Sequence, residues 1–157
     1  MTTEAAPGSV VVGVEHGGGS RTAIRMAAQE ARFRHATLIA VMAYSGDRAM
    51  APAGRPTASS STAGEERFAA ESALRDAVVD ALGEEADQVE LRTALGLAGH
   101  NLVDTARRVN AQLIVLAGRG STSMLLGTVS QYVLRKAPCP VLVVPDGGEA
   151  PAPAGRG

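Results

Sequence analysis

Aromatic residues and lysine are the residue types that this sequence almost lacks. Phe, Tyr and Trp together make up 3% of the chain, and Trp is absent. We therefore do not expect a protein that binds nucleic acid by stacking bases on aromatic side chains. Lys136 is the only lysine, and no Gly-Lys pair followed by Ser or Thr occurs, which excludes a Walker A phosphate loop.

An excess of one charge, paired cysteines and long apolar runs are also missing. The 15 basic and 16 acidic side chains give a net charge of -1, which argues against electrostatic capture of nucleic acid or an anionic membrane. Cys139 stands alone, and the three histidines lack metal-ligand spacing. No segment approaches the roughly 20 apolar residues that span a bilayer, and residues 1–7 do not resemble a signal peptide. We expect a cytoplasmic protein with no metal site and no nucleic-acid or membrane partner.

Aliphatic residues must supply the core, because hydrophobic residues make up 45% of the chain and so few are aromatic. A length of 157 residues suits one compact domain. We expect this domain to cover residues 9–145, after a flexible N-terminus at residues 1–8. Residues 45–64 are rich in Ala, Pro, Gly, Ser and Thr and predict a flexible loop, and residues 146–157 predict a disordered tail.

Apolar runs without alternation predict buried strands, and helical spacing predicts the helices between them. The expected strands are Ser9–Val14, Thr37–Ala43, Val89–Ala94, Gln112–Ala117 and Val141–Val144. The first expected helix has Ser20 as its N-cap and ends near His35, and the second runs from Glu65 to Leu82, where Gly83 stops it. The third contains the apolar stripe Leu102–Val109 and is preceded by Gly96 and Gly99. The fourth runs from Thr128 to Lys136. This alternation predicts an α/β fold with a doubly wound parallel sheet.

Two glycine-rich segments, Glu15–Ser20 and Gly118–Ser130, follow the first and fourth expected strands. In an open parallel sheet, ligands bind beyond the carboxyl ends of the strands, where the strand order reverses. Glycine backbones and the helix N-terminus at Thr128 could together hold a phosphate ester, with Thr128 and Ser130 as hydroxyl donors. His16 could contact a phosphate or ribose, or lie solvated in its loop. From the residues alone, the glycines could equally form tight turns.

Three longer segments resemble the universal stress protein family. GRGSTSMLLGTVSQYVLRKAPCPVLVV, from Gly118 to Val144, is similar to the C-terminal signature of that family. VVVGVEHGGGSRTAIRMAAQEA, from Val10, is similar to its first strand and helix, and GLAGHNLVDTARRVNAQLIVLAGRG, from Gly96, to its third helix and fourth strand. The resemblance covers most of residues 9–145. It implies an open five-stranded parallel sheet of order 3-2-1-4-5 with helices on both faces.

The resemblance also implies a site for an adenine nucleotide. The adenosine side would be lined by Val14, Glu15 and Ala43. The phosphates would be held by Gly118, Arg119, Gly120, Gly127, Thr128, Val129 and Ser130. The sequence departs from the family pattern in three ways: Ala117 replaces the first glycine of the phosphate loop, six residues instead of nine separate Gly120 from Gly127, and Glu15 stands where Asp is usual.

The implied function is that of a stress-response protein that binds ATP or another adenine nucleotide, with or without magnesium, and acts as a nucleotide-gated switch. The alternative is a dimeric interaction module of the same fold that binds no nucleotide. In either case the resemblance implies a homodimer that pairs Val141–Val144 across a two-fold axis. No catalytic residue is assigned, because the nucleophile and metalloprotease motifs are absent. Weak ATP hydrolysis or autophosphorylation ranks last.

Overall fold

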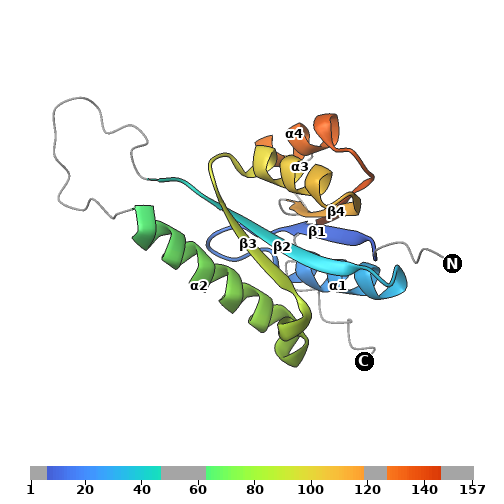
Figure 1. The fold of residues 1–157 in the computed structure, drawn as a ribbon, viewed down its shortest axis with the longest axis horizontal. Helices are drawn as coiled ribbons and strands as arrows, with labels where there is room; N and C mark the ends of the chain where they lie inside the picture. Colours follow the sequence, from blue (N-terminus) through green and yellow to red (C-terminus); the bar gives the residue numbers. More distant parts are fainter. Residues whose placement is uncertain (1–6, 47–62, 119–126, 146–157) are drawn as a thin grey trace, which may run out of the picture.

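The computed structural model describes residues 7–46, 63–118 and 127–145. Within them, five strands form one parallel sheet of order β3-β2-β1-β4-β5 (Figure 1). The strands are β1 (Ser9–Gly13), β2 (Thr37–Tyr44), β3 (Glu90–Leu95), β4 (Ala111–Gly118) and β5 (Val141–Pro145). This order confirms the predicted α/β fold with strands in the order 3-2-1-4-5.

The three central strands are buried on both faces. Every residue of β1 is buried, and so are the apolar runs in the middle of β2 and β4. Val11 of β1 lies between Ile39 of β2 and Ile114 of β4. Branched aliphatic side chains fill the pleated surface well, and helices on both sides remove the need for polar alternation. The almost complete lack of aromatic residues therefore does not prevent a closely packed core.

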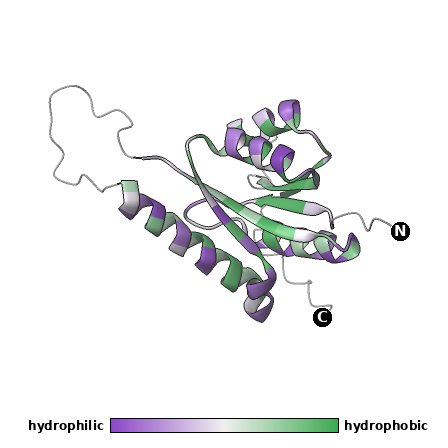
Figure 2. Cartoon of the chain, viewed as in Figure 1, coloured by the Kyte–Doolittle hydropathy of each residue, from purple (hydrophilic) through white to green (hydrophobic). Residues whose placement is uncertain are grey.

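Helices cover both faces of the sheet. Within the described residues, α1 (Arg21–Phe33) and α2 (Ala63–Leu82) pack on one face, and α3 (Ala98–Arg108) and α4 (Thr128–Lys136) pack on the other (Figure 1). Figure 2 shows that hydrophobic residues concentrate in the strands, whereas the helices alternate between hydrophobic and hydrophilic residues. Each helix therefore turns an apolar stripe toward the sheet and a polar surface toward solvent.

The second helix begins two residues before its predicted start and ends at its predicted last residue, Leu82. α2 includes Ala63 and Gly64, which were predicted as the end of a flexible loop. After Leu82 the chain continues as a 3-10 helix, η1 (Gly83–Gln88), which was not predicted. Gly83 has a φ of +59°, in the left-handed region that favours glycine, so it ends the α-helix without straightening the chain.

The third helix begins at Ala98, before its predicted apolar stripe, so Gly99 lies inside it. A Cβ atom on Gly99 would lie 2.9 Å from Cδ1 of Tyr132 in α4, closer than packed atoms approach. The side chains of Tyr132 and His100 stack with ring centroids 4.2 Å apart. Gly99 is therefore needed for the close packing of α3 on α4, and not for a turn before the helix.

Several predicted features fall on residues that the structure does not describe. They are most of the segments predicted to be flexible or disordered, at residues 1–6, 47–62 and 146–157. Within the described part of the chain, no helix combines the length and the apolar character needed to cross a membrane.

Candidate functional site

The topology places a crevice between the carboxyl ends of β1 and β4. From β1 the chain crosses to β2 and β3 on one side, and from β4 it crosses to β5 on the other. The helices that follow β1 and β4 therefore lie on opposite faces, and the connections diverge at this point. Such a divergence is where open α/β sheets bind ligands.

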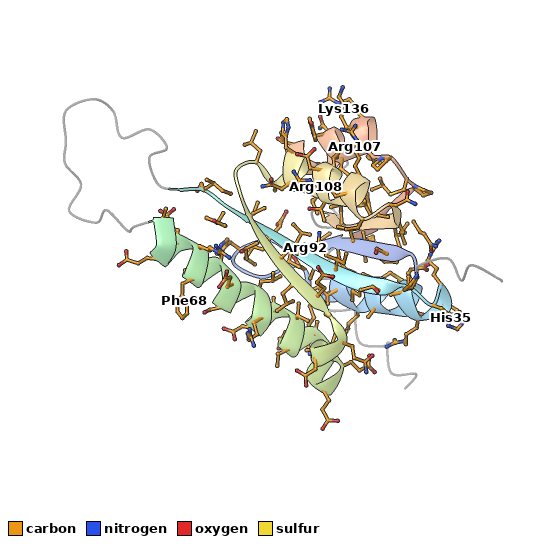
Figure 3. All side chains as sticks on the ribbon, viewed as in Figure 1. His35, Phe68, Arg92, Arg107, Arg108 and Lys136 are labelled. Carbon is orange, nitrogen blue, oxygen red and sulfur yellow. The ribbon has the colours of Figure 1, made fainter. Side chains whose placement is uncertain are left out.

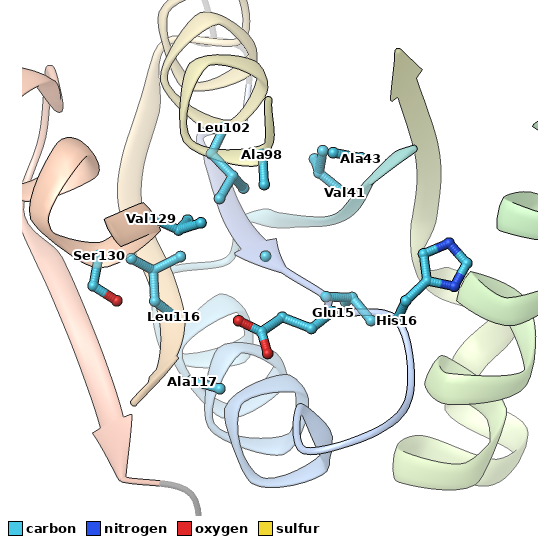
Figure 4. Close-up of a pocket in the computed structure, with 12 residues that line it drawn as sticks. Glu15, His16, Val41, Ala43, Ala98, Leu102, Leu116, Ala117, Val129 and Ser130 are labelled. Atoms are coloured by element: carbon cyan, nitrogen blue, oxygen red, sulfur yellow. The ribbon is translucent and has the colours of Figure 1, made fainter. Parts of the chain in front are cut away.

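A pocket of about 210 Å³ lies in this crevice (Figure 4). Residues from β1, β2, β4, α3 and α4 all contribute to its wall. The lining residues are Gly13, Val14, Glu15, His16, Val41, Ala43, Ala98, Leu102, Leu116, Ala117, Val129 and Ser130. Most of these side chains are small or aliphatic, so the pocket suits a flat, largely apolar group with polar atoms at its edge.

Gly13 at the end of β1 lies in close contact with two leucine side chains. A Cβ atom there would lie 3.0 Å from one δ-methyl of Leu102 and 3.1 Å from one of Leu116. Leu102 comes from α3 and Leu116 from β4, so these side chains close over the glycine from two elements. The missing side chain lets the inner wall of the pocket pack tightly.

Two hydrogen bonds from main-chain amides hold the loop after β1. The amide of Val14 donates to the carbonyl oxygen of Val41 at 2.9 Å, which extends the pairing of β1 and β2 beyond the strand. The amide of Glu15 donates to Oγ of Ser20 at 3.0 Å. Ser20 occupies the N-cap position of the first helix, as predicted, but its hydroxyl makes no capping bond. The buried hydroxyl instead holds the backbone of Glu15 at the pocket.

A second, smaller hollow of about 90 Å³ adjoins the first at the N-terminus of α4. It is lined by Glu15, Ala117, Gly127, Thr128, Val129 and Ser130. Gly127 is extended, with φ -62° and ψ 166°, and α4 starts directly after it. The first amides of a helix have no partner within the helix, and its N-terminal end carries a partial positive charge. This end of the crevice therefore suits a small anionic group.

The structure brings most of the predicted site residues together. The larger pocket contains Val14, Glu15, Ala43, Val129 and Ser130, and the smaller hollow adds Gly127 and Thr128. Gly118 lines neither hollow, because it lies at the end of β4 paired with Pro145, where a Cβ atom would meet Val143 Cγ1 at 3.1 Å. The remaining two predicted residues, Arg119 and Gly120, lie outside the described residues.

Several pocket residues were missed from the sequence. They are Gly13, Val41, Ala98, Leu102 and Leu116. Ala98 and Leu102 were missed because α3 follows β3, at the far edge of the sheet, and returns across β2 and β1. The turn glycine Gly96 was the available signal, since it marks the start of a helix at the carboxyl edge of the sheet, where ligands bind.

Glu15 carries the only formal charge at the two hollows among the described residues. Its carboxylate points toward Ala117 and the start of α4, whereas the ring of His16 points away from them (Figure 4). The basic residues of α4, Arg135 and Lys136, lie in its last turn, at the opposite end of the helix. In the described ranges, no group of three or more His, Cys, Asp or Glu side chains is placed to hold a metal ion.

Known proteins with similar sequences and folds agree on one family. The sequence pattern of the universal stress protein family matches residues 8–145. A universal stress protein of Synechocystis is 43% identical over 53 residues, which span 32% of this chain and 34% of that protein.

Two solved structures extend the comparison to nearly the whole chain. Universal stress protein UspA from Lactobacillus plantarum has a TM-score of 0.66 at 24% identity, covering 90% of this chain and 99% of that one. A universal stress protein solved in complex with cAMP has a TM-score of 0.63 at 27% identity, covering 91% of this chain and 100% of that one. With a family match that spans the whole sheet and both helical layers, this chain belongs to the universal stress protein family.

Proposed function

We propose that this protein binds an adenine nucleotide in the crevice between β1 and β4 and acts as a nucleotide-gated switch in a stress response. The observation that carries the proposal is the aliphatic pocket of about 210 Å³ that opens directly onto the N-terminus of α4. A base and sugar need the first environment, and a phosphate needs the second. The relative that was solved with cAMP is 27% identical to this chain and supports the same class of ligand.

The adenosine would occupy the larger pocket. Val14 and Ala43 offer apolar surface at the ends of β1 and β2, and Ala98 closes the pocket from the first turn of α3. The volume of about 210 Å³ lies below the roughly 300–1,000 Å³ of pockets that enclose drug-sized ligands. The pocket therefore suits a nucleoside better than a whole nucleoside triphosphate, whose outer phosphates would extend beyond it.

The phosphate nearest the sugar would lie at the start of α4. The unpaired amides of the first turn would donate to it, together with the hydroxyls of Thr128 and Ser130. Arg119 and Gly120 belong to the same proposed contact surface by resemblance. ATP, ADP, AMP and cAMP share this first phosphate, so each is a candidate ligand, with magnesium as a companion for the longer phosphate chains.

The pocket can be tested by filling it. Ala98→Phe would place an aromatic ring in the space proposed for adenosine, and we expect at least about a tenfold loss of affinity for cAMP and ATP. Ala63→Phe is the matched control, because Ala63 is the exposed first residue of α2 and lines neither hollow of the crevice. Calorimetric titration measures both variants, and circular dichroism checks that both are folded. Equal affinities for Ala98→Phe and the wild type would contradict the assigned pocket.

Homodimerisation through β5 belongs to the same proposal. β5 is an edge strand that pairs only with β4 within the described residues, and its residues Val141, Leu142 and Val143 are half-buried. An apolar edge strand that pairs with a second copy hides both its backbone groups and its side chains. This edge also favours the second candidate function, a dimeric interaction module that binds no nucleotide.

A further inference from the structure

A groove of about 390 Å³ runs between α2 and the edge strand β3, at the opposite edge of the sheet from β5. α2 and β3 lie side by side along this edge (Figure 1). The helix contributes Arg67, Glu71, Leu74 and Arg75, and the strand contributes Leu91, Arg92 and Thr93. The groove does not share any lining residue with the nucleotide crevice.

The backbone of β3 offers hydrogen-bonding groups to this groove. Alternate residues of a strand direct their N–H and C=O groups to opposite sides. The amide of Gly96 donates to the carbonyl of Tyr44 in β2 at 2.9 Å, so the even-numbered residues of β3 face β2. Leu91 and Thr93 therefore point their amides and carbonyls outward. β3 pairs only with β2 among the described strands, which leaves this edge open for another strand.

The charges in the groove favour an acidic occupant. Arg67, Glu71 and Arg75 of α2 carry its charges, whereas Arg92 of β3 is in register with Val41, which packs on the opposite face of the sheet. Arg67 pairs with Glu71 at 2.8 Å, and Arg92 pairs with Glu90 at 2.6 Å; Figure 3 shows Arg92 at the middle of β3. Arg75 forms no ion pair with any residue of the described ranges. The guanidinium of Arg75 is therefore free to bind a carboxylate of an incoming chain, and Arg67 could bind a second one while it stays paired with Glu71.

We propose that this groove binds an extended acidic segment of a partner protein, which adds to β3 as a sixth strand. Arg67 and Arg75 are eight residues apart on α2, about 12 Å along the helix axis. Residues four apart on a strand are separated by about 13 Å and share a face. Glu71 lies midway between the two arginines, where an acidic side chain would be repelled. The geometry therefore specifies acidic residues at positions i and i+4 of the segment, with an uncharged residue at i+2.

The proposal is tested with a fluorescein-labelled peptide, Ser-Glu-Thr-Val-Thr-Glu-Ser, and the same peptide with Gln in place of both Glu residues. In low salt, we expect the acidic peptide to bind the wild-type chain at least about tenfold more tightly than the Gln peptide. Arg75→Glu should reduce its affinity by at least about tenfold. Arg135→Glu is the matched control: it is an exposed arginine of α4 on the opposite face of the sheet, and it should leave the affinity unchanged. Fluorescence anisotropy measures all four affinities.

Amide exchange provides a second readout that tests strand addition itself. If the peptide adds to β3, the amides of Leu91 and Thr93 become hydrogen-bonded and their exchange slows at least about tenfold. Unchanged exchange of both amides would overturn the proposal, and so would equal affinities of the wild type for the two peptides. The proposal would also be overturned if Arg135→Glu lowered the affinity for the acidic peptide as much as Arg75→Glu does. Sedimentation that shows a dimer dissociated by Arg75→Glu would assign the groove to a second copy of this chain, and would overturn the proposal as well.

Discussion

Glu15 lines both hollows of the crevice, so its carboxylate would lie beside both the adenosine and the phosphate of the proposed nucleotide. A carboxylate beside the proposed phosphate position repels negative charge, and the repulsion grows with the number of phosphates. We expect Glu15→Gln to raise the affinity for ATP about three- to tenfold, with a smaller gain for cAMP, which carries a single negative charge.

Calorimetric titration of both nucleotides measures this difference, with Glu84→Gln as the control because Glu84 is exposed on η1 at the other end of the sheet. The repulsion account is contradicted if both nucleotides gain equally in Glu15→Gln, or if neither gains. Absence of any binding to the wild type would instead contradict the proposed function.

Cys139 lies half-buried between Pro138 and Pro140 in the sequence. Burial raises the pKa of its thiol, and a hydrogen bond with the backbone of Ile114 partly offsets this rise. The thiolate is the reactive form. We expect iodoacetamide at pH 8 to label Cys139 several-fold more slowly in the folded chain than in urea, with roughly a tenfold difference for each unit by which the pKa is raised. Mass spectrometry of timed samples measures both rates.

The same raised pKa fixes the sign of the pH dependence. The folded chain retains the thiol proton at a pH where the unfolded chain loses it, so the folded state is favoured below the unfolded pKa and loses this advantage as pH rises through the folded pKa. Denaturant unfolding should therefore show a decline in stability above about pH 8.5 that Cys139→Ala reduces. Equal labelling rates in the folded and unfolded chains would contradict the assigned burial.

At the scale of elements, the edge strand β5 carries the dimer proposal. Val143→Arg places a cation on an apolar edge, and burying it without a partner should weaken the dimer about a hundredfold. The matched control is Val79→Arg, because Val79 is 50% exposed on α2. Sedimentation of the wild type and both variants at several concentrations measures the equilibrium. A wild type that sediments as a monomer, or a Val143→Arg variant that remains dimeric, contradicts pairing through β5.

Helix bounds could be predicted from sequence where local signals coincide. α4 was predicted at its observed bounds, because Gly127 precedes it and the paired prolines Pro138 and Pro140 follow it. The start of α3 was not predicted, because Gly99 is a weak helix former in isolation. Its place in the helix is set by the ring of Tyr132, which contacts it from another element. A contact between elements distant in sequence leaves no local pattern.

Side-chain roles at the site were harder to predict than element bounds. Ser20 has the residue type and position of an N-cap, yet its hydroxyl oxygen accepts a hydrogen bond from the backbone amide of Glu15 in the preceding loop. Both arrangements satisfy one hydrogen-bonding group near the start of α1, so residue type cannot distinguish them. The choice depends on the path of the glycine-rich loop, where Gly17, Gly18 and Gly19 all have positive φ.

At the scale of the whole molecule, the alternation of strands and helices predicted a doubly wound sheet, and the family resemblance supplied the strand order that the structure confirms. The position of the crevice follows from that order, because β1 and β4 are neighbours whose connections diverge. The contribution of α3 to the pocket could not be read from the sequence alone. It depends on a crossover that brings Ala98 and Leu102 over Gly13 from the far side of the sheet.

The crevice between β1 and β4 lies at the centre of the sheet, and within the described residues the sheet has open strands at its two edges, β3 and β5. These are three separate surfaces, so the proposed ligand, the proposed second copy and the proposed acidic partner could be bound at the same time. A partner could then respond to bound nucleotide without competing with it for the same site, as coupling between two sites requires.

The most direct test of the nucleotide proposal is a titration of the isotopically labelled chain with cAMP, followed by the chemical shifts of its backbone amides. We predict saturable shifts at Val14, Ala43, Ala98 and Ser130, which come from four different elements or loops and all line the pocket. Amides in the groove, such as that of Thr93, should not move. An absence of shifts at millimolar cAMP, AMP and ATP, or shifts that leave these four amides unchanged, would contradict the central claim.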